Sequence, residues 1–237
     1  MTLFKLNKSI CLVVFSEIKQ FLCHIKYWLF AINFFINFGS SKKNVDMSIA
    51  AKKALDKIKA GNEQYLEDKE HVGTDKRIRE NLITGQDPYA IVLSCADSRV
   101  VPESIFDANA GELFVLRVAG NIANTSTIAS IEYAVAHLGT KLIVVLGHES
   151  CGAVTAALAG GDNGHNLNHL CSHIVPAIAA SESNEVNDVV RMNAKITCKD
   201  LVSRSEIIRN AVNNGGLEIV PAFYNLSNGK VDILQDI

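Results

Sequence analysis

Short runs of consecutive apolar residues recur along most of the chain and alternate with segments of helical periodicity. Runs without alternation are typical of strands that are buried on both faces. Between two of them, Ile128, Ile131 and Val135 repeat at spacings of three and four, which indicates an amphipathic helix. This order predicts an α/β fold with a mainly parallel sheet flanked by helices. The predicted strands lie at Ala90–Leu93, Leu113–Val118, Leu142–Leu146, Leu217–Phe223 and Val231–Leu234.

Polar residues suggest where several of these elements begin and end. Ser48 is suited to cap a helix at the start of the globular pattern, forming a helical N-terminal arm. Thr125 or Ser126 is expected to cap the helix that follows the second strand, and Val186–Val212 to be mostly helical. The turn sequence Ser227–Gly229 predicts a hairpin that adds an edge strand to the sheet.

Metal-binding residue types follow two of the predicted strands. Cys95 comes directly after the first, while His148 and Cys151 follow the third. The carboxyl ends of strands in an open α/β sheet border the crevice where ligands bind. Two thiolates and one imidazole suit zinc, and three protein ligands leave one position open for chemistry. Alternatively, the cysteines are small buried apolar residues at strand ends, which is common.

A carboxylate and a guanidinium lie beside the first of these cysteines. Asp97 could orient a hydroxide on the metal by accepting its hydrogen bond, and Arg99 could fix Asp97 by a bidentate pair. A bound Zn²⁺ can lower the pKa of water to about 7 and so supply hydroxide at neutral pH. This combination favours attack on a small electrophile.

The segment Cys95–Arg99, followed by His148-x-x-Cys151, resembles the signature of the β-class carbonic anhydrases. The likeness covers roughly Ile49 to the carboxyl terminus. It implies zinc-dependent, reversible hydration of carbon dioxide to bicarbonate and a proton, with one Zn²⁺ per chain on Cys95, His148 and Cys151. Zinc-bound hydroxide would attack the substrate, oriented by Asp97 and Arg99. The likeness continues through Gly85–Pro88, Gly111–Phe114, Ser130–Ala134 and Gly147–Gly152.

The same resemblance implies a substrate pocket and an open metal site. Gln86, Phe114 and Tyr133 match the family's substrate-binding glutamine, phenylalanine and tyrosine, although core packing or a loop position also explains them. Family members in which the aspartate closes the site on zinc carry tryptophan three positions before the first cysteine. Val92 takes that position here, which predicts the open form, although Arg117 could belong to such a bicarbonate pocket.

Two other functions fit the same residues. Relatives on this fold hydrolyse carbon disulfide or carbonyl sulfide, and the sequence does not show the entrance that would decide the substrate. A non-catalytic zinc site in a binding protein is the other alternative. Such a structural site normally has four strong protein ligands, whereas three are evident, and it would leave Asp97 and Arg99 without a role.

Composition divides the 237-residue chain into two parts. Residues 1–46 form an apolar extension, and residues 47–237 are the expected catalytic domain. The run Tyr27–Phe38 is shorter than the roughly 20 residues that span a bilayer. The extension is interpreted as a wrongly assigned start before Met47, as a signal or anchor, or as a structured arm.

Charge and cysteine content limit the partners and the compartment. A formal net charge of −2 gives no electrostatic case for nucleic acid, and membrane contact is expected only through residues 1–46. Thiolates that bind zinc favour a reducing compartment, so a cytoplasmic location is expected, with export or membrane attachment as the alternative. The resemblance implies a homodimer or homotetramer whose active sites lie at subunit interfaces, with the helix near Ser48 a candidate for exchange between subunits.

Overall fold

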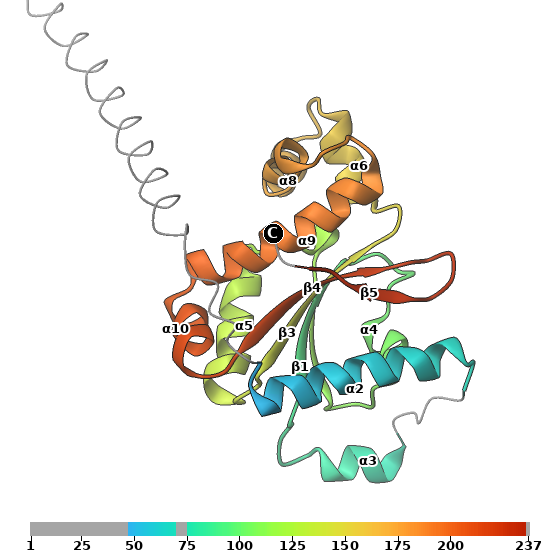
Figure 1. Cartoon of the computed structure of the whole chain (residues 1–237), viewed down its shortest axis with the longest axis vertical. Helices are drawn as coiled ribbons and strands as arrows, with labels where there is room; N and C mark the ends of the chain where they lie inside the picture. The colour runs from blue at the N-terminus through green and yellow to red at the C-terminus, as the bar shows by residue number, and fades with distance from the viewer. Residues whose placement is uncertain (1–46, 70–74, 236–237) are drawn as a thin grey trace, which may run out of the picture. The chain divides into compact units, whose positions relative to one another are not determined.

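A five-stranded sheet organises the structure, a computed structural model that describes residues 47–69 and 75–235 (Figure 1). The predictions for residues 1–46 lie outside the described residues. The strand order is β2-β1-β3-β4-β5. The first four strands run parallel, and β5 pairs antiparallel with β4. The strands are β1 (Ala90–Ser94), β2 (Leu113–Arg117), β3 (Leu142–His148), β4 (Glu218–Tyr224) and β5 (Val231–Ile233).

The two strands at the centre of the metal prediction are direct neighbours in this sheet. Every residue of β1 and β3 is buried, as their uninterrupted apolar runs predict. Ser94 pairs with Leu146, so both strands deliver their next residues to the same edge of the sheet. The predicted fold class is confirmed, and so is the edge strand, which follows a turn where Gly229 has a φ of +77°.

Helices cover both faces of the sheet (Figure 1). On one face, α2 and α4 pack over Val92 and Val144. On the other, α5, α9 and α10 pack over Ile91 and Ile143. The bounds of these helices are Ile49–Leu66 for α2, Pro102–Ile105 for α4, Thr125–His137 for α5, Val186–Arg204 for α9 and Glu206–Asn214 for α10. The other helical elements are α3 (Lys76–Asn81), the short 3₁₀ helix η1 (Ala119–Asn121), α6 (Gly152–Ala159), α7 (His165–Ser172) and α8 (Val175–Ala180).

Helix α2 begins as predicted and covers the sheet of its own chain. The Ser48 hydroxyl accepts a hydrogen bond from the Ala51 N–H and donates one to the Gly216 carbonyl, 2.7 Å away. Ala54 and Ile58 are buried in the core on that face. Exchange of this helix between subunits stays a prediction.

One predicted helix cap is wrong, and one predicted helical segment is divided in two. The N-cap of α5 is Asn124, whose side chain accepts from the Thr127 N–H, and not Thr125 or Ser126. The segment 186–212 is mostly helical, as predicted, but it forms two helices, because Ser205 has extended backbone angles and caps α10 by accepting from the Ile208 N–H. Its hydroxyl also lies 2.6 Å from Glu132 Oε1 on α5, so a tertiary contact fixes the break.

No helix in the described part of the chain has both the length and the apolar character needed to cross a membrane.

The crossing of α2 over the end of α4 requires a glycine. A Cβ on Gly61 would lie 1.9 Å from the Phe106 carbonyl oxygen, which belongs to the backbone and cannot rotate away. Gly61→Ala is therefore expected to lower the free energy of unfolding by about 3 kcal/mol in urea denaturation, although alanine normally favours a helix. Gly85→Ala is the control, because no atom lies within 4 Å of its added Cβ. Equal stability of the two variants would contradict this packing.

Candidate metal centre

Three candidate ligands converge where β1 and β3 end. Cys95 directly follows β1, His148 is the last residue of β3, and Cys151 is the N-cap of α6. A sharp turn returns the chain from β3 to α6, with Ser150 in the left-handed region at a φ of +56°. The Ser150 N–H donates to the Asn187 side chain of α9 at 2.9 Å, which holds the turn.

The distances within this group fit a single zinc ion. The ligand atoms of Cys95, His148 and Cys151 all lie within 4.8 Å of one another, and all three residues are buried. The two Sγ atoms are 4.0 Å apart. Zn–S bonds of about 2.3 Å in tetrahedral geometry require sulfur atoms about 3.8 Å apart. Among the described residues, no other group of three or more ligand side chains meets this test.

The histidine is fixed in the tautomer that a metal needs. Nδ1 lies 2.9 Å from the Glu149 carbonyl oxygen, and a carbonyl only accepts, so Nδ1 carries the proton. Nε2 is buried and has no hydrogen-bond partner. A buried acceptor without a partner costs about 1–3 kcal/mol, and a metal ion bound at Nε2 removes that cost.

The two thiols behave as one unit. The pKa of Cys95 is lowered to about 4, first by the hydrogen bond from the Cys151 thiol and also by the hydrogen bond from the Gly120 N–H. The pKa of Cys151 is raised by the same contact with Cys95 and by burial. One thiolate therefore forms readily, whereas the second forms when a cation compensates its charge. This donor pair suits Zn²⁺.

Asp97 lies beside the ligands and is held by Arg99. The guanidinium donates from Nε to Oδ1 at 2.9 Å and from Nη2 to Oδ2 at 2.7 Å, and the Arg99 N–H also donates to Oδ1. These bonds keep the pKa of Asp97 well below its usual range. Oδ2 lies 3.9 Å from His148 Nε2. The structure therefore holds an ionised carboxylate next to the position that a metal ion would take.

Replacing Arg99 is expected to change the titration of Asp97. Because the folded pKa of Asp97 is depressed, its pair with Arg99 contributes fully to stability above the unfolded pKa of about 3.9. This contribution decreases as the pH falls from there and is gone below the folded pKa. In Arg99→Gln the pKa of Asp97 should rise toward about 3.9, since the main cause of its depression is removed. Carboxyl NMR titration of the unaltered chain and the variant measures this change. An unchanged Asp97 titration would contradict the role given to Arg99.

Arg117 has a role that the sequence did not indicate. The sequence related it to a bicarbonate pocket, but its guanidinium donates to the Cys95 carbonyl at 3.1 Å and to the Asp97 carbonyl at 2.6 Å. It therefore ties the end of β2 to the loop that carries both a ligand and the carboxylate. In the sequence, Arg117 is marked only by its place near the end of the predicted strand Leu113–Val118, and its contact with the Cys95 loop follows from the pairing of β2 with β1.

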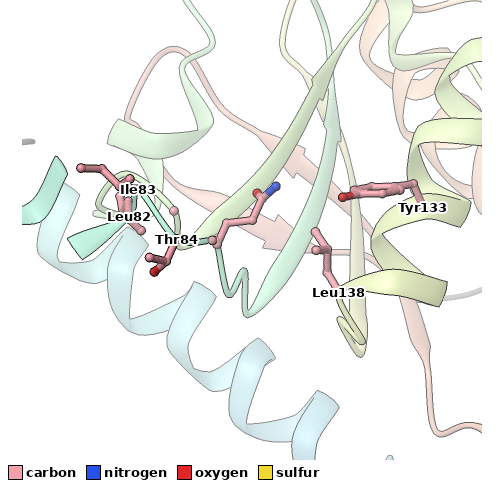
Figure 2. Close-up of a pocket in the computed structure, with 8 residues that line it drawn as sticks. Leu82, Ile83, Thr84, Tyr133 and Leu138 are labelled. Carbon is pink, nitrogen blue, oxygen red and sulfur yellow. The ribbon is translucent and has the colours of Figure 1, made fainter. Parts of the chain in front are cut away.

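The three predicted substrate residues lie together but apart from this centre. Gln86 and Tyr133 line a pocket of about 460 Å³ whose lining contains none of the three ligands. In Figure 2, Leu82, Ile83 and Thr84 lie on one side of this pocket, and Tyr133 and Leu138 on the other.

Phe114 joins the same group from the sheet edge. Its ring lies 6.3 Å from that of Tyr133, measured between centroids. Phe114 pairs with Ile91, four residues before Cys95, which places it about 13 Å from that cysteine along the sheet. Within one chain, the substrate residues and the metal ligands therefore form two separate groups.

Comparison with known proteins relates this chain to a family of enzymes. Residues 90–231 match the family model for carbonic anhydrase. A relative from Mycobacterium tuberculosis, carbonic anhydrase 2, is 38% identical over 196 residues, which cover 79% of this chain and 93% of the relative. The structure also matches a crystal structure of a β-carbonic anhydrase from Sordaria macrospora. This chain belongs to the β-carbonic anhydrase family. The family assignment makes it an enzyme, with a Cys95–His148–Cys151 group suited to one zinc ion.

Other relatives support the assignment to the β-carbonic anhydrases. The Sordaria structure has a TM-score of 0.62 and 29% sequence identity, and the match covers 68% of this chain and 87% of that one. The carbonic anhydrase of Mycolicibacterium smegmatis is 35% identical over 193 residues, covering 78% of this chain and 92% of the relative. The family-model match over residues 90–231 includes strands β1 to β4 and the candidate metal centre.

Proposed function

We propose that this chain catalyses the reversible hydration of carbon dioxide to bicarbonate and a proton. The observation that carries the proposal is the buried Cys95–His148–Cys151 group with an ionised Asp97 oxygen 3.9 Å from His148 Nε2. Three strong ligands with a carboxylate nearby differ from a structural zinc site, which is closed by four. Family membership supports carbon dioxide as the substrate.

In this proposal, different residues bind the metal, orient the attacking water and position the carboxylate. Cys95, His148 and Cys151 hold the zinc ion, which when bound supplies a Lewis acid that makes water nucleophilic near neutral pH. Asp97 accepts a hydrogen bond from the attacking water and so orients its lone pair toward the substrate carbon. Arg99 fixes the plane of the carboxylate and keeps it ionised.

The engagement of Asp97 by Arg99 supports the open form of the site. Both carboxylate oxygens accept hydrogen bonds from the guanidinium, so neither is directed only at the ligand group. Val92 is buried in β1, where the sequence pattern of closed sites would require a tryptophan. We therefore expect Asp97 to remain outside the zinc coordination in the resting enzyme.

We infer further that two or more copies assemble so that Gln86, Phe114 and Tyr133 serve the metal centre of a neighbouring subunit. β2 is an edge strand of the sheet, and Tyr133, which lines the same pocket as Gln86, is 48% exposed. Exposed edge strands readily pair with another chain. The Sordaria relative is described as tetrameric, which supports a homodimer or homotetramer here.

Mixing two inactive variants tests this assembly. If Gln86 acts on a neighbouring subunit, Asp97→Asn subunits mixed with Gln86→Ala subunits form hybrid dimers in which one site carries both changes and the other carries none. Random mixing should then restore about one quarter of the unaltered activity in a two-fold symmetric dimer. No recovery after refolding the mixture would show that Gln86 and Asp97 act in the same chain.

The substrate is tested by comparing three small electrophiles on one zinc-loaded sample. Stopped-flow measurements with carbon dioxide, carbonyl sulfide and carbon disulfide should give the highest kcat/KM for carbon dioxide. A preference for either sulfur compound would replace the proposed reaction with hydrolysis of that compound. Binding of zinc without turnover of any of the three would favour the non-catalytic zinc protein.

We expect residues 47–237 to form the catalytic domain. The family match spans residues 90–231, and the proposed site residues lie between Gln86 and Cys151. A cytoplasmic location stays a prediction, with export or membrane attachment through residues 1–46 as the alternative.

A further inference from the structure

A buried asparagine on α9 lies among apolar residues next to the metal centre. Asn193 is 1% exposed, and its neighbours Val189 and Val190 belong to the apolar cluster around Cys95 and Cys151. Its Nδ2 donates to the Gly120 carbonyl at 2.8 Å, while its Oδ1 is buried without a partner. A buried polar group that is only partly hydrogen-bonded lowers the stability of the fold. The presence of an asparagine at this position, bonded only through its Nδ2, therefore calls for an explanation.

That hydrogen bond holds the short helix η1, which faces the first metal ligand. Gly120 has a φ of +70°, and its N–H lies 3.4 Å from Cys95 Sγ. A Cβ at this position would come within 2.9 Å of Ile174 and 3.3 Å of Ala153, so the backbone is also confined by packing. Because the N–H and C=O of Gly120 both have fixed partners, rotation of this residue breaks both contacts together.

We propose that Asn193 is a positioning residue for the zinc site, acting through Gly120 on the Cys95 sulfur. Asn193 anchors the Gly120 carbonyl from α9, and this anchor keeps the Gly120 N–H directed at Sγ. An N–H group that points at a metal-bound sulfur withdraws electron density from it and orients its lone pairs. The inference rests on the proposed role of Cys95 as a zinc ligand.

Loss of this anchor should weaken zinc binding and change the metal–sulfur bond itself. Asn193→Leu removes the donor at similar side-chain shape, and Asn193→Ala serves as the second variant if leucine disturbs folding. Thr197→Val is the matched control, because Thr197 is also buried on α9, one turn away, and is not part of the Cys95 contacts. All are compared in the full chain.

Two measurements decide the matter: the zinc dissociation constant from competition with a chromophoric chelator, and the sulfur-to-metal charge-transfer band of the Co²⁺-substituted protein. We expect Asn193→Leu or Asn193→Ala to weaken zinc binding about 10-fold or more and to shift the band, with Thr197→Val unchanged in both. Equal effects in Thr197→Val, or an unshifted band, would overturn the inference. An unaltered chain that binds no zinc would overturn the proposed function as well, so the two failures are distinguishable.

Discussion

Asp97→Asn is expected to lower kcat/KM for carbon dioxide hydration at least about 100-fold without loss of zinc. Asparagine keeps the shape of the side chain but replaces one carboxylate oxygen by an amide donor and removes the charge that Arg99 pairs with. The attacking water then loses the acceptor that orients it. Because none of the three candidate ligands is altered, zinc content should stay near one per chain.

Two measurements on the same sample separate this effect from a loss of structure. Stopped-flow kinetics give kcat/KM, and metal analysis gives the zinc content. Asp56→Asn is the control, since Asp56 is exposed on α2. A variant at Asp97 that keeps full zinc and more than about one tenth of the activity would show that this carboxylate is not the essential acceptor.

Cys95→Ser should remove both the metal and the activity. A serine hydroxyl is a harder and much less acidic ligand than a thiolate, so the site loses one of its two sulfur donors for zinc. His148 Nε2 and the Cys151 thiol then remain buried without the compensating cation. The stability that zinc binding adds is lost as well, about 4 kcal/mol at a free zinc concentration 1,000 times the dissociation constant.

Metal analysis, thermal unfolding and carbon dioxide hydration should therefore change together in Cys95→Ser. The control is Cys171→Ser, which alters a buried cysteine of α7 outside the ligand group. Chelation of the unaltered chain should reproduce the Cys95→Ser behaviour, and Zn²⁺, but not Mg²⁺, should reverse it, because thiolates prefer zinc. Retention of one tightly bound zinc in Cys95→Ser would contradict the assigned ligand set.

The sheet and the ligand group could be predicted because strong, local signals specify them. Uninterrupted apolar runs mark β1 and β3, and parallel pairing then brings Cys95 and His148 to the same edge. The spacing of His148 and Cys151 fits a tight turn between a strand and a helix. The left-handed conformation of Ser150 in that turn gave no signal, because serine does not mark such a position as glycine does.

Helix boundaries were less predictable where several residues compete for one role. Asn124, Thr125 and Ser126 are all good N-cap residues, so local preference could not distinguish them. The break at Ser205 depends on its contact with Glu132 in a different helix. Neither outcome follows from periodicity alone.

The residues around the metal ligands were hard to predict from the sequence, because tertiary contacts bring them together. Asn193 lies on the buried face of α9. In the sequence, its role was indicated only by its being a polar residue among the apolar residues of that face. Its partner Gly120 is 73 residues away in sequence. Gln86 precedes β1 and Cys95 follows it, so the predicted strand already separated these two residues. The position of Tyr133, in contrast, follows from the packing of α5 against β1 and β2, which residue type does not encode.

The most direct test of the proposed zinc-dependent reaction is carbon dioxide hydration as a function of zinc occupancy in the full chain. Metal-free protein is reconstituted in steps, and each sample is assayed for bound zinc and for stopped-flow hydration between about pH 6.5 and 9. The rate should rise linearly from the uncatalysed background to a maximum at one zinc per chain. Hydration without zinc, or a fully zinc-loaded chain that does not hydrate carbon dioxide at any of these pH values, would contradict the proposed reaction.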